Sequence, residues 1–301
     1  MYLEDAIEEF LLDCQIRKLS KRTVQNYGVL LNLMSHYLHD KLSVITLEEV
    51  KPIHVKRFIQ LQEERGRKPQ YINDLLKAFR VFFKYCESEE YITEIPTARI
   101  RNVKQPKTLI RGFDEKEIAD MLTYYNGPDY QSMRNKTMLA LMFDTGIRLN
   151  EMLTLRPEQI MKDRILIHGK GNKERYVPIS PYLAKQLVRY RAARISFFEA
   201  NVHAENYYFL SYRGNKLTGE VVRKMMIEAA EAVGVRKDIR VSPHTCRHTF
   251  AHLQLKNGLD IYSLSRLLGH ESIAITQRYL DGIRTEEILD KAKGTGVLEH
   301  L

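Results

Sequence analysis

The sequence predicts a mainly α-helical chain with a small β component, arranged as an N-terminal helical bundle followed by an α+β domain. Three observations lead to this prediction. A chain of 301 residues is long enough to bury two hydrophobic cores. Apolar residues recur at helical spacing through most of the chain. A Gly-rich turn between two short strand-like segments marks a β-hairpin.

The composition is that of a folded globular protein with a basic surface. Apolar residues make up 44% of the chain and charged residues 28%, which is too apolar for a disordered protein. The net charge of +9 favours a polyanion such as nucleic acid, although a membrane surface or solubility explains it equally well. The sequence shows no run of about 18 apolar residues and begins with an acidic segment, so we expect neither membrane spanning nor export.

The three cysteines, Cys14, Cys86 and Cys246, lie far apart in the sequence. Their spacing fits neither a disulfide framework nor a metal-binding pair such as C-x-x-C. We therefore expect a protein of the reducing cytoplasm that binds no metal.

Residues 1–94 are expected to form an N-terminal helical domain. Apolar residues at helical spacing predict one helix before Ser20 and a second after it. Two more helices are predicted near 47–63 and 69–87. The last of these has a basic face formed by Lys77, Arg80 and Lys84, which is typical of a solvated helix face and also of a nucleic-acid contact.

Residues 95–112 are expected to form an extended basic linker. The stretch from Ile95 to Phe113 contains cations but no acidic residue, and Pro96 and Pro106 disfavour a helix. Such a strap could follow a phosphate backbone. Its cations are Arg99, Arg101, Lys104, Lys107 and Arg111.

Residues 113–301 are expected to form the second domain. Asp114 and Glu117 have the spacing of a capping box, which predicts a helix to about residue 125. Helices follow near 132–144 and 148–155, and ILIHGKGNKERYVPI predicts two strands around a Gly-Lys-Gly-Asn turn. From residue 182 helices dominate, apart from a strand-like YYFL at 207–210, and a last helix is expected over about 285–293.

The segment after Ser242-Pro243 predicts an anion site at a helix N-terminus. Ser is a preferred N-cap residue and Pro a preferred first helical residue. His244, Arg247 and His248 then lie in the opening turns, where free backbone N–H groups and the helix dipole favour anions. A surface turn that happens to contain two histidines is the alternative interpretation.

Four further polar positions have equally ordinary interpretations when each is considered alone. Arg148 follows a Thr-Gly break and could form a structural ion pair with Glu151. Lys170 is typical of a solvated turn lysine at the hairpin tip. His270 follows Gly269, which predicts a helix end, and could act as a cap. Tyr279 shares a helix face with a threonine three residues earlier and could simply pack.

Taken in order, Arg148, Lys170, His244, Arg247, His270 and Tyr279 resemble the polar residues of the tyrosine recombinase family, also called phage integrases. The strings that carry the resemblance are TGIRLNE, HGKGNKERYVPI, SPHTCRHTFA and LLGHESIAITQRYL, all in the family's order. Together they span most of 145–280, and the hairpin string and the last string look especially like the Xer and integrase branch. The N-terminal domain resembles the family's core-binding domain more loosely.

The resemblance implies a role for each matching residue in phosphoryl transfer. Arg148 and Arg247 would clamp the non-bridging oxygens of a DNA phosphate, a task suited to the planar guanidinium. His270 would donate to the developing charge, and His244 would hold the phosphate or move a proton. Lys170, or Lys173 in the same turn, would protonate the departing 5′ oxygen. Tyr279 would attack and form a 3′-phosphotyrosine, with no cofactor.

The resemblance also implies double-stranded DNA as substrate and a homo-tetramer on paired sites, with a partner recombinase or an accessory protein as a further option. The expected DNA contacts outside the catalytic set are Lys21, Thr23, Lys77, Arg80, Lys84, Lys104 and Lys107. The alternatives are a type IB topoisomerase, which shares the tyrosine chemistry, and a non-catalytic DNA-binding protein. An RNA-binding protein is disfavoured because the sequence lacks an aromatic stacking platform. The target sequence and the biological role stay open.

Overall fold

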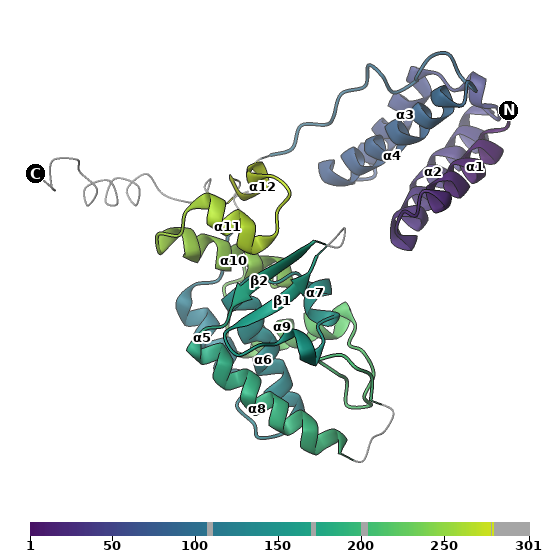
Figure 1. Ribbon diagram of the computed structural model, residues 1–301. Helices are drawn as coiled ribbons and strands as arrows, with labels where there is room; N and C mark the ends of the chain where they lie inside the picture. Colours follow the sequence, from purple (N-terminus) through teal and green to yellow (C-terminus); the bar gives the residue numbers. More distant parts are fainter. Residues whose placement is uncertain (107–110, 170–172, 200–203, 278, 280–301) are drawn as a thin grey trace, which may run out of the picture. The chain divides into compact units, whose positions relative to one another are not determined.

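The computed structural model describes residues 1–106, 111–169, 173–199, 204–277 and 279 (Figure 1). The chain divides into two compact units, Met1–Lys107 and Thr108–Leu301, hereafter the first and second units. Both are built mostly from helices, and a two-stranded sheet lies in the second. The prediction of a mainly helical chain with a small β component is therefore confirmed. The helix expected over 285–293 falls outside the described residues.

The first unit is a bundle of four α-helices around an aromatic core. Its elements are α1 (Leu3–Ile16), α2 (Lys21–Leu42), the short 3-10 helix η1 (Leu47–Glu49), α3 (Pro52–Glu64) and α4 (Pro69–Ser88). Ser20 caps α2 as expected, since its hydroxyl accepts the backbone N–H of Thr23. The core contains Phe10, Phe58, Phe79 and Phe82, all almost completely buried. Contacts between such rings add to the apolar area that the bundle buries.

Two segments of the first unit differ from expectation. The region 47–63 is not one helix, because Val50 and Lys51 are extended and α3 starts only at Pro52. Proline has no backbone N–H to donate, so it is accepted at the first position of a helix but not in its interior. The start of the expected linker is not extended. Residues 96–99 form a turn, and Ile95, Ile100 and Val103 pack against the bundle. Within the described part of the linker, residues 100–106 and 111–112 form no helix, strand or turn.

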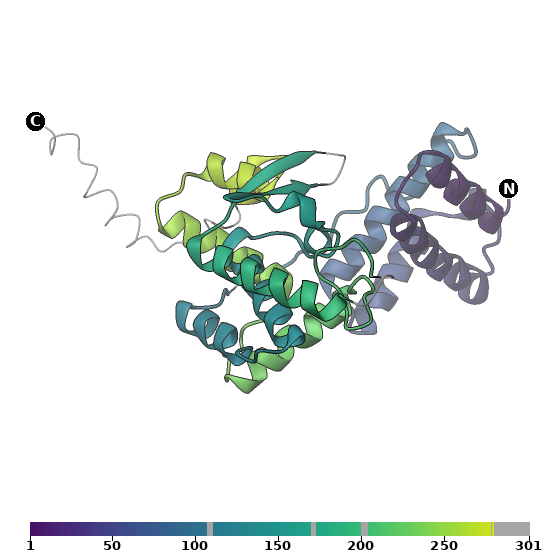
Figure 2. The ribbon, with the colours of Figure 1, turned by 60° about the horizontal axis from the view of Figure 1, so that its bottom comes forward.

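The second unit contains nine helical segments among its described residues. They are α5 (Glu115–Tyr124), α6 (Tyr130–Thr145), α7 (Leu149–Leu153), η2 (Pro157–Gln159), α8 (Pro181–Phe198), α9 (Gly219–Ala232), α10 (Pro243–Lys256), α11 (Ile261–Leu268) and α12 (Ile273–Gln277). The predicted capping box of Asp114 and Glu117 begins α5. Helices α6 and α8 pack along each other (Figure 2).

The β-hairpin pairs β1 (Arg164–His168) with β2 (Glu174–Pro178) in antiparallel register. Ile165 and Val177 face each other across it and are buried in the main core of this unit. The prediction of a strand at 207–210 is wrong. Only Leu210 forms an isolated bridge, because Tyr208 and Phe209 are buried in the core instead of pairing with a neighbouring strand. Aromatic residues are common both in strands and in buried loops, and here the aromatic composition of this segment reflects burial.

A smaller apolar cluster lies apart from the main core of the second unit. It is formed by α10, α11 and the chain after α12, through Phe250, Leu264, Leu268 and Tyr279. This cluster fixes α11 against α10, so that the end of α11 faces the turn between α6 and α7. The polar residues singled out in the sequence gather at that end.

Candidate active site

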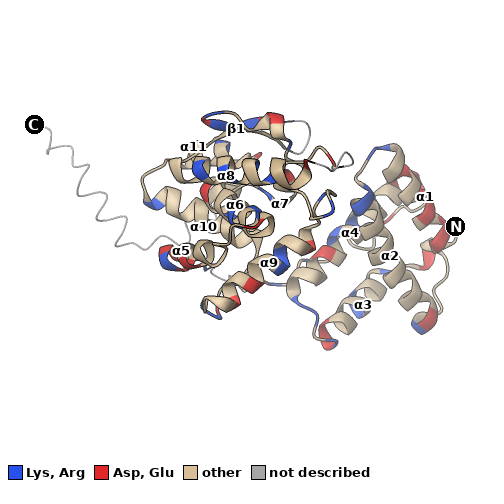
Figure 3. Cartoon of the chain, turned by 90° about the horizontal axis from the view of Figure 1, so that it is seen from below, with Lys and Arg blue, Asp and Glu red and all other residues tan. Residues whose placement is uncertain are grey.

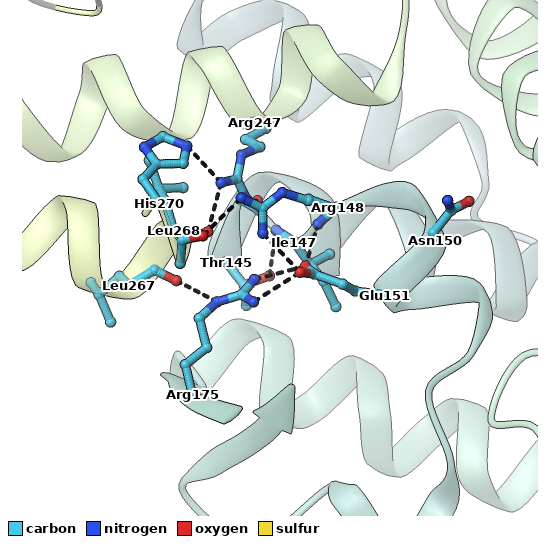
Figure 4. A network of polar contacts seen from close by, with 12 residues as sticks. Thr145, Ile147, Arg148, Asn150, Glu151, Arg175, Arg247, Leu267, Leu268 and His270 are labelled. Atoms are coloured by element: carbon cyan, nitrogen blue, oxygen red, sulfur yellow. Dashed lines mark hydrogen bonds and ion pairs between the residues drawn. The ribbon is translucent and has the colours of Figure 1, made fainter. Parts of the chain in front are cut away.

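The carboxyl end of α11 is where the candidate residues meet. Gly269 ends this helix in a left-handed conformation with a φ of 63°. The last carbonyls of a helix lack intrahelical partners and carry partial negative charge, which attracts cations. Arginines from three separate parts of the chain donate to three consecutive carbonyls, those of Leu267, Leu268 and Gly269 (Figure 4).

Arg247 comes from the first turns of α10 and is 4% exposed. Its Nη2 donates to the carbonyl oxygen of Leu268 at 2.6 Å, and its Nη1 to that of Gly146 at 2.7 Å. Gly146 has a φ of 59°, and an added Cβ would lie 2.5 Å from Cδ1 of Phe250, so only glycine fits there. Burial and then the charge of Arg148 lower the pKa of Arg247 to about 10, which leaves it protonated at neutral pH.

Arg148 caps the start of α7 and is the more accessible of the two arginines expected to clamp a phosphate. Its Nη2 donates to the carbonyl oxygen of Gly269 at 2.9 Å, and its Nη1 to Oε1 of Glu151 at 2.9 Å. Its backbone N–H also donates to Glu151. The ion pair with Glu151 is therefore present, but 40% of the Arg148 side chain is still exposed and can contact a ligand.

Arg175 is a third arginine of this site, and the sequence did not single it out. It projects from β2, and its Nε donates to the carbonyl oxygen of Leu267 at 2.7 Å. Its two terminal nitrogens bind both carboxylate oxygens of Glu151, at 2.9 and 2.7 Å. Although burial alone would raise the pKa of Glu151, hydrogen bonds from Arg175 and its charge lower it, so the carboxylate stays ionised.

His270 lies directly after Gly269 and is held by two neighbours. Nη2 of Arg247 lies 2.9 Å from Nε2 of His270, and Oγ1 of Thr276 lies 2.8 Å from Nδ1. Arginine can only donate, so Nε2 accepts and the ring proton lies on Nδ1, which donates to Thr276. Burial and then the charges of Arg247, Arg148 and Arg175 lower the pKa of His270 to about 4. His270 is therefore neutral at physiological pH.

Tyr279 lies just beyond α12, and its backbone N–H donates to the carbonyl of Thr276 at 3.0 Å. Its ring is 7% exposed and packs within the apolar cluster around Phe250. The ring centroid lies 5.2 Å from that of His248 and 6.2 Å from that of His270, with the second pair nearly parallel. Tyr279 thus lies beside His248 and His270, among apolar side chains.

The other two catalytic predictions are less constrained by the structure. His244 is solvent-exposed near the start of α10, and its pKa is lowered by partial loss of water around the ring and then by the charge of Arg247. Lys170 lies outside the described residues, so its role stays a prediction. Lys173, the alternative in the same turn, is exposed, and its Nζ lies 3.9 Å from a carboxylate oxygen of Glu271.

The cations expected to contact DNA from the first unit are mostly free on its surface. Lys21, Lys77 and Lys84 are exposed on helices, and Lys104 is exposed in the segment after the bundle. Figure 3 marks the charged residues along the chain by colour, with acidic residues on α1. Lys107 lies outside the described residues.

Two of the expected DNA contacts also take part in local structure. Thr23 forms a hydrogen bond with the hydroxyl of Ser20 at 2.7 Å in the cap of α2. Arg80 donates to the carbonyl of Ile100 at 2.7 Å and to the side chain of Asn102 at 2.8 Å. Arg80 therefore fastens the start of the linker to α4, so its guanidinium is less available to DNA than the neighbouring lysines.

The arginine cluster, which we define as Arg148, Arg175 and Arg247, is suited to bind an anion. With Glu151 ionised and His270 neutral, the cluster has an excess of positive charge. Its guanidinium groups are fixed by backbone carbonyls and retain N–H groups that are not used in these contacts. Among the described residues, no group of His, Cys, Asp and Glu could hold a metal ion, and no helix is long and apolar enough to cross a membrane.

Comparison with known proteins finds matches to known families over almost the whole chain. Residues 111–284 match the phage integrase family, and residues 7–90 match the phage integrase, N-terminal SAM-like domain. A tyrosine recombinase XerD of Oceanobacillus iheyensis is 30% identical over 281 residues, covering 92% of this chain and 93% of that protein. A tyrosine recombinase XerC of Bacillus pumilus is 30% identical over 236 residues, covering 77% of each.

The fold is likewise similar to that of solved recombinases. The crystal structure of the XerH site-specific recombinase bound to palindromic difH substrate, a post-cleavage complex, has a TM-score of 0.75 to this chain. It is 20% identical and covers 94% of this chain and 82% of that one. A Tn1549 transposon integrase in complex with a circular intermediate DNA also has a TM-score of 0.75, at 14% identity, covering 98% and 100%.

Proposed function

The chain belongs to the phage integrase family of tyrosine recombinases, and we propose that it recombines DNA at specific sites with Tyr279 as the nucleophile. Members of this family cleave and rejoin DNA strands. The observation that carries the proposal for this chain is the arginine cluster, because Arg148 and Arg247 are fixed together beside His270 and near Tyr279. The comparisons favour neither a topoisomerase nor a non-catalytic DNA-binding protein.

In the proposed reaction, the phenol oxygen of Tyr279 attacks a DNA phosphorus, and its proton passes to His244 or to solvent. The bond to the 5′ oxygen breaks, and the product is a 3′-phosphotyrosine and a free 5′ hydroxyl. Attack by a 5′ hydroxyl reverses these steps and rejoins a strand, so the energy of the broken linkage is retained. The phosphotyrosine intermediate is the feature that separates this mechanism from direct hydrolysis.

Arg148 and Arg247 bind the non-bridging oxygens, on which negative charge builds during attack. Donors that are fixed before the substrate arrives stabilise this charge best, since no reorganisation is then needed. The carbonyls of Gly269, Leu268 and Gly146 provide that fixation. Lys170, which we prefer to Lys173, protonates the departing 5′ oxygen.

His270 contributes once a phosphate has entered. Its Nε2 accepts a hydrogen bond from Arg247 in this structure, so donation to a phosphate oxygen requires a proton at Nε2. The negative charge of the phosphate favours that proton, since it opposes the effect of the arginines. His244, exposed near the start of α10, assists by holding the phosphate or transferring a proton.

The partners follow from the same chemistry. The XerH and Tn1549 structures contain DNA, and double-stranded DNA is the substrate we propose here. We further propose that four copies act on two paired sites, alone or with a partner recombinase, and that the reaction takes place in the cytoplasm. Exposed cations of the first unit, such as Lys77 and Lys84, supply phosphate contacts.

Capture of the phosphotyrosine on a nicked suicide substrate tests the proposal. The full chain is incubated without ATP with nicked DNA that carries Xer-type sites or the sequence flanking its own gene, and adducts are resolved on a denaturing gel. We expect an adduct with the wild type and none with Tyr279→Phe. Tyr262→Phe is the matched control, because Tyr262 is an exposed tyrosine of α11 that lies outside the arginine cluster.

An adduct that persists in Tyr279→Phe would reject Tyr279 as the nucleophile. An adduct that is lost in both variants would instead point to damage of the α11 region. Wild-type DNA binding without any adduct, on all sites, would reject catalysis by the chain alone and favour a requirement for a partner recombinase.

A further inference from the structure

We propose that Arg175 is a positioning residue of the recombination reaction. It holds the catalytic arginines, His270 and strand β2 in one arrangement, without itself contacting the reacting atoms. This inference rests on the proposed function. Its basis is the position of one guanidinium at the junction of β2, α7 and α11 (Figure 4).

Three nitrogens of Arg175 are each used in a separate contact. Nε binds the carbonyl of Leu267, while Nη1 and Nη2 bind the two oxygens of Glu151 side by side. Only 10% of the Arg175 side chain and 7% of the Glu151 side chain are exposed. Only a planar fork can satisfy this arrangement, because a lysine ammonium at the same position could not bridge both oxygens and the carbonyl.

Glu151 links Arg175 to Arg148, because it accepts hydrogen bonds from both side chains. The same carboxylate accepts from the Nη1 and the backbone N–H of Arg148, so its two oxygens are shared between the two arginines. Without Arg175, the buried carboxylate of Glu151 would have Arg148 as its one remaining cationic partner among the described residues. Arg148 would then be drawn further onto Glu151 and away from the phosphate that it is proposed to bind.

Arg175 also acts on the end of α11. Its aliphatic stem lies against Gly269, where an added Cβ would be 3.0 Å from Cδ of Arg175. Leu267, which it binds, precedes the carbonyls of Leu268 and Gly269 that fix Arg247 and Arg148. A shift of this turn would move His270 as well, since His270 follows it directly.

The third link is to the hairpin. Arg175 is paired with Ile167 in the register of β1 and β2, and the tip that contains Lys170 lies between these strands. The side chain of Arg175 therefore joins the base of that tip to the phosphate-binding arginines. We infer that strand β2 and the anion site are held in register through this one residue.

The test is single-turnover cleavage of the suicide substrate by Arg175→Lys and Arg175→Ala, together with DNA affinity and the thermal midpoint Tm. We expect both variants to bind DNA within about threefold of the wild type but to form the adduct about 100-fold more slowly, the penalty typical of a small misplacement of catalytic groups. Added ethylguanidinium should restore part of the rate of Arg175→Ala, and an equal concentration of sodium chloride should not.

Val177→Ala is the matched structural control, because Val177 is buried on the same strand but contacts the apolar core. We expect it to lower Tm and to leave the cleavage rate near the wild-type value below its midpoint. Equal losses of rate in Val177→Ala and Arg175→Lys, without rescue, would show that Arg175 only stabilises the fold. A wild-type rate in Arg175→Lys would also overturn the inference.

These outcomes are distinct from failure of the proposed function. If the wild type forms no adduct, the recombinase proposal fails first. If the wild type forms the adduct and Arg175→Lys matches it, only the role of Arg175 fails. Should Arg175→Ala be too unstable to assay, the comparison of Arg175→Lys with Val177→Ala at matched fractions of folded protein decides the question.

Discussion

The cations of the two units are held in opposite ways. In the first unit, Lys77 and Lys84 are exposed on one face of α4, and neither ammonium group forms an ion pair with another residue that the structure describes. In the second unit, the guanidinium groups of Arg148 and Arg247 are fixed by carbonyls at the end of α11. The difference suggests a division of labour, in which mobile charges attract a phosphate backbone and fixed charges stabilise one phosphate during reaction.

Arg80 shows that the division does not simply follow the boundary between the units. It lies on the same face of α4 as the two lysines, yet its guanidinium binds the carbonyl of Ile100 and the side chain of Asn102. Its fixation supports the chain after the bundle. A cation is therefore assigned to one class or the other by its contacts, and mutation should separate the two classes.

Among the cations, the largest effect is expected from Arg247→Lys. Lysine is long enough to reach one carbonyl but cannot bind both Leu268 and Gly146 and still present a fork to a phosphate. We expect adduct formation to slow by about 10²–10³-fold, the usual result of removing one preorganised donor. The free energy of unfolding should fall by about 1–3 kcal/mol, because a buried carbonyl loses its partner.

Single-turnover cleavage and urea unfolding measure the two effects of Arg247→Lys separately. A cleavage rate within tenfold of the wild type would mean that positive charge alone suffices at this position. The distinction between fixed and mobile cations would then lose its main support.

An intermediate effect is expected from pH, through His270. Its pKa is about 4 in the folded chain and about 6.5 when unfolded, so the unfolded state binds more protons between these values. The free energy of unfolding should therefore fall as the pH is lowered from 7 towards 4. The contribution of this one residue is about 2–3 kcal/mol, since one pKa unit corresponds to about 1.4 kcal/mol.

His270→Asn isolates that contribution. Asparagine does not titrate, and its amide N–H can donate to Thr276 as Nδ1 of His270 does. Urea unfolding of the wild type and the variant at several pH values between 4 and 7 gives the difference. Parallel pH dependences would show that neither burial nor the arginine cluster lowers the pKa of His270 in the folded chain.

How much of this arrangement could be predicted differs between the two units. The helices of the first unit follow from local apolar spacing, and Ser20 identifies one of the helix starts. In the second unit, Gly269 and Ser242 identified the ends that matter, and the motif strings identified Arg148, Arg247, His270 and Tyr279. These predictions needed only residue type, spacing and resemblance.

Arg175 could not be found in the same way. Its hydrogen-bond partners lie 24 and 92 residues away in the sequence, and a charged residue in an alternating strand is usually a solvated one. The strand-like YYFL segment failed for a related reason, because burial of Tyr208 and Phe209 mimics the composition of a strand. Long-range polar contacts and loop burial leave little local signal.

The smallest effect is expected from Lys77→Gln, the substitution of a mobile cation. Removing one phosphate contact should lower the slope of log affinity against log salt by about 1, whatever the DNA sequence. Tm and the cleavage rate at saturating DNA should stay unchanged, because Lys77 is exposed and lies in the other unit from the arginine cluster. Arg80→Gln is the control on the same face, and we expect it to lower Tm because the contacts to Ile100 and Asn102 are lost.

Salt titrations of DNA binding, followed by fluorescence anisotropy, measure the slopes for both variants. An unchanged slope for Lys77→Gln would remove this face of α4 from the DNA contacts, so that its charge would serve solubility. A loss of cleavage rate at saturation would mean that Lys77 does more than attract the backbone. In that case Lys77 would be fixed by contacts that form only on DNA, and the contrast between mobile and fixed cations would not hold for the free protein.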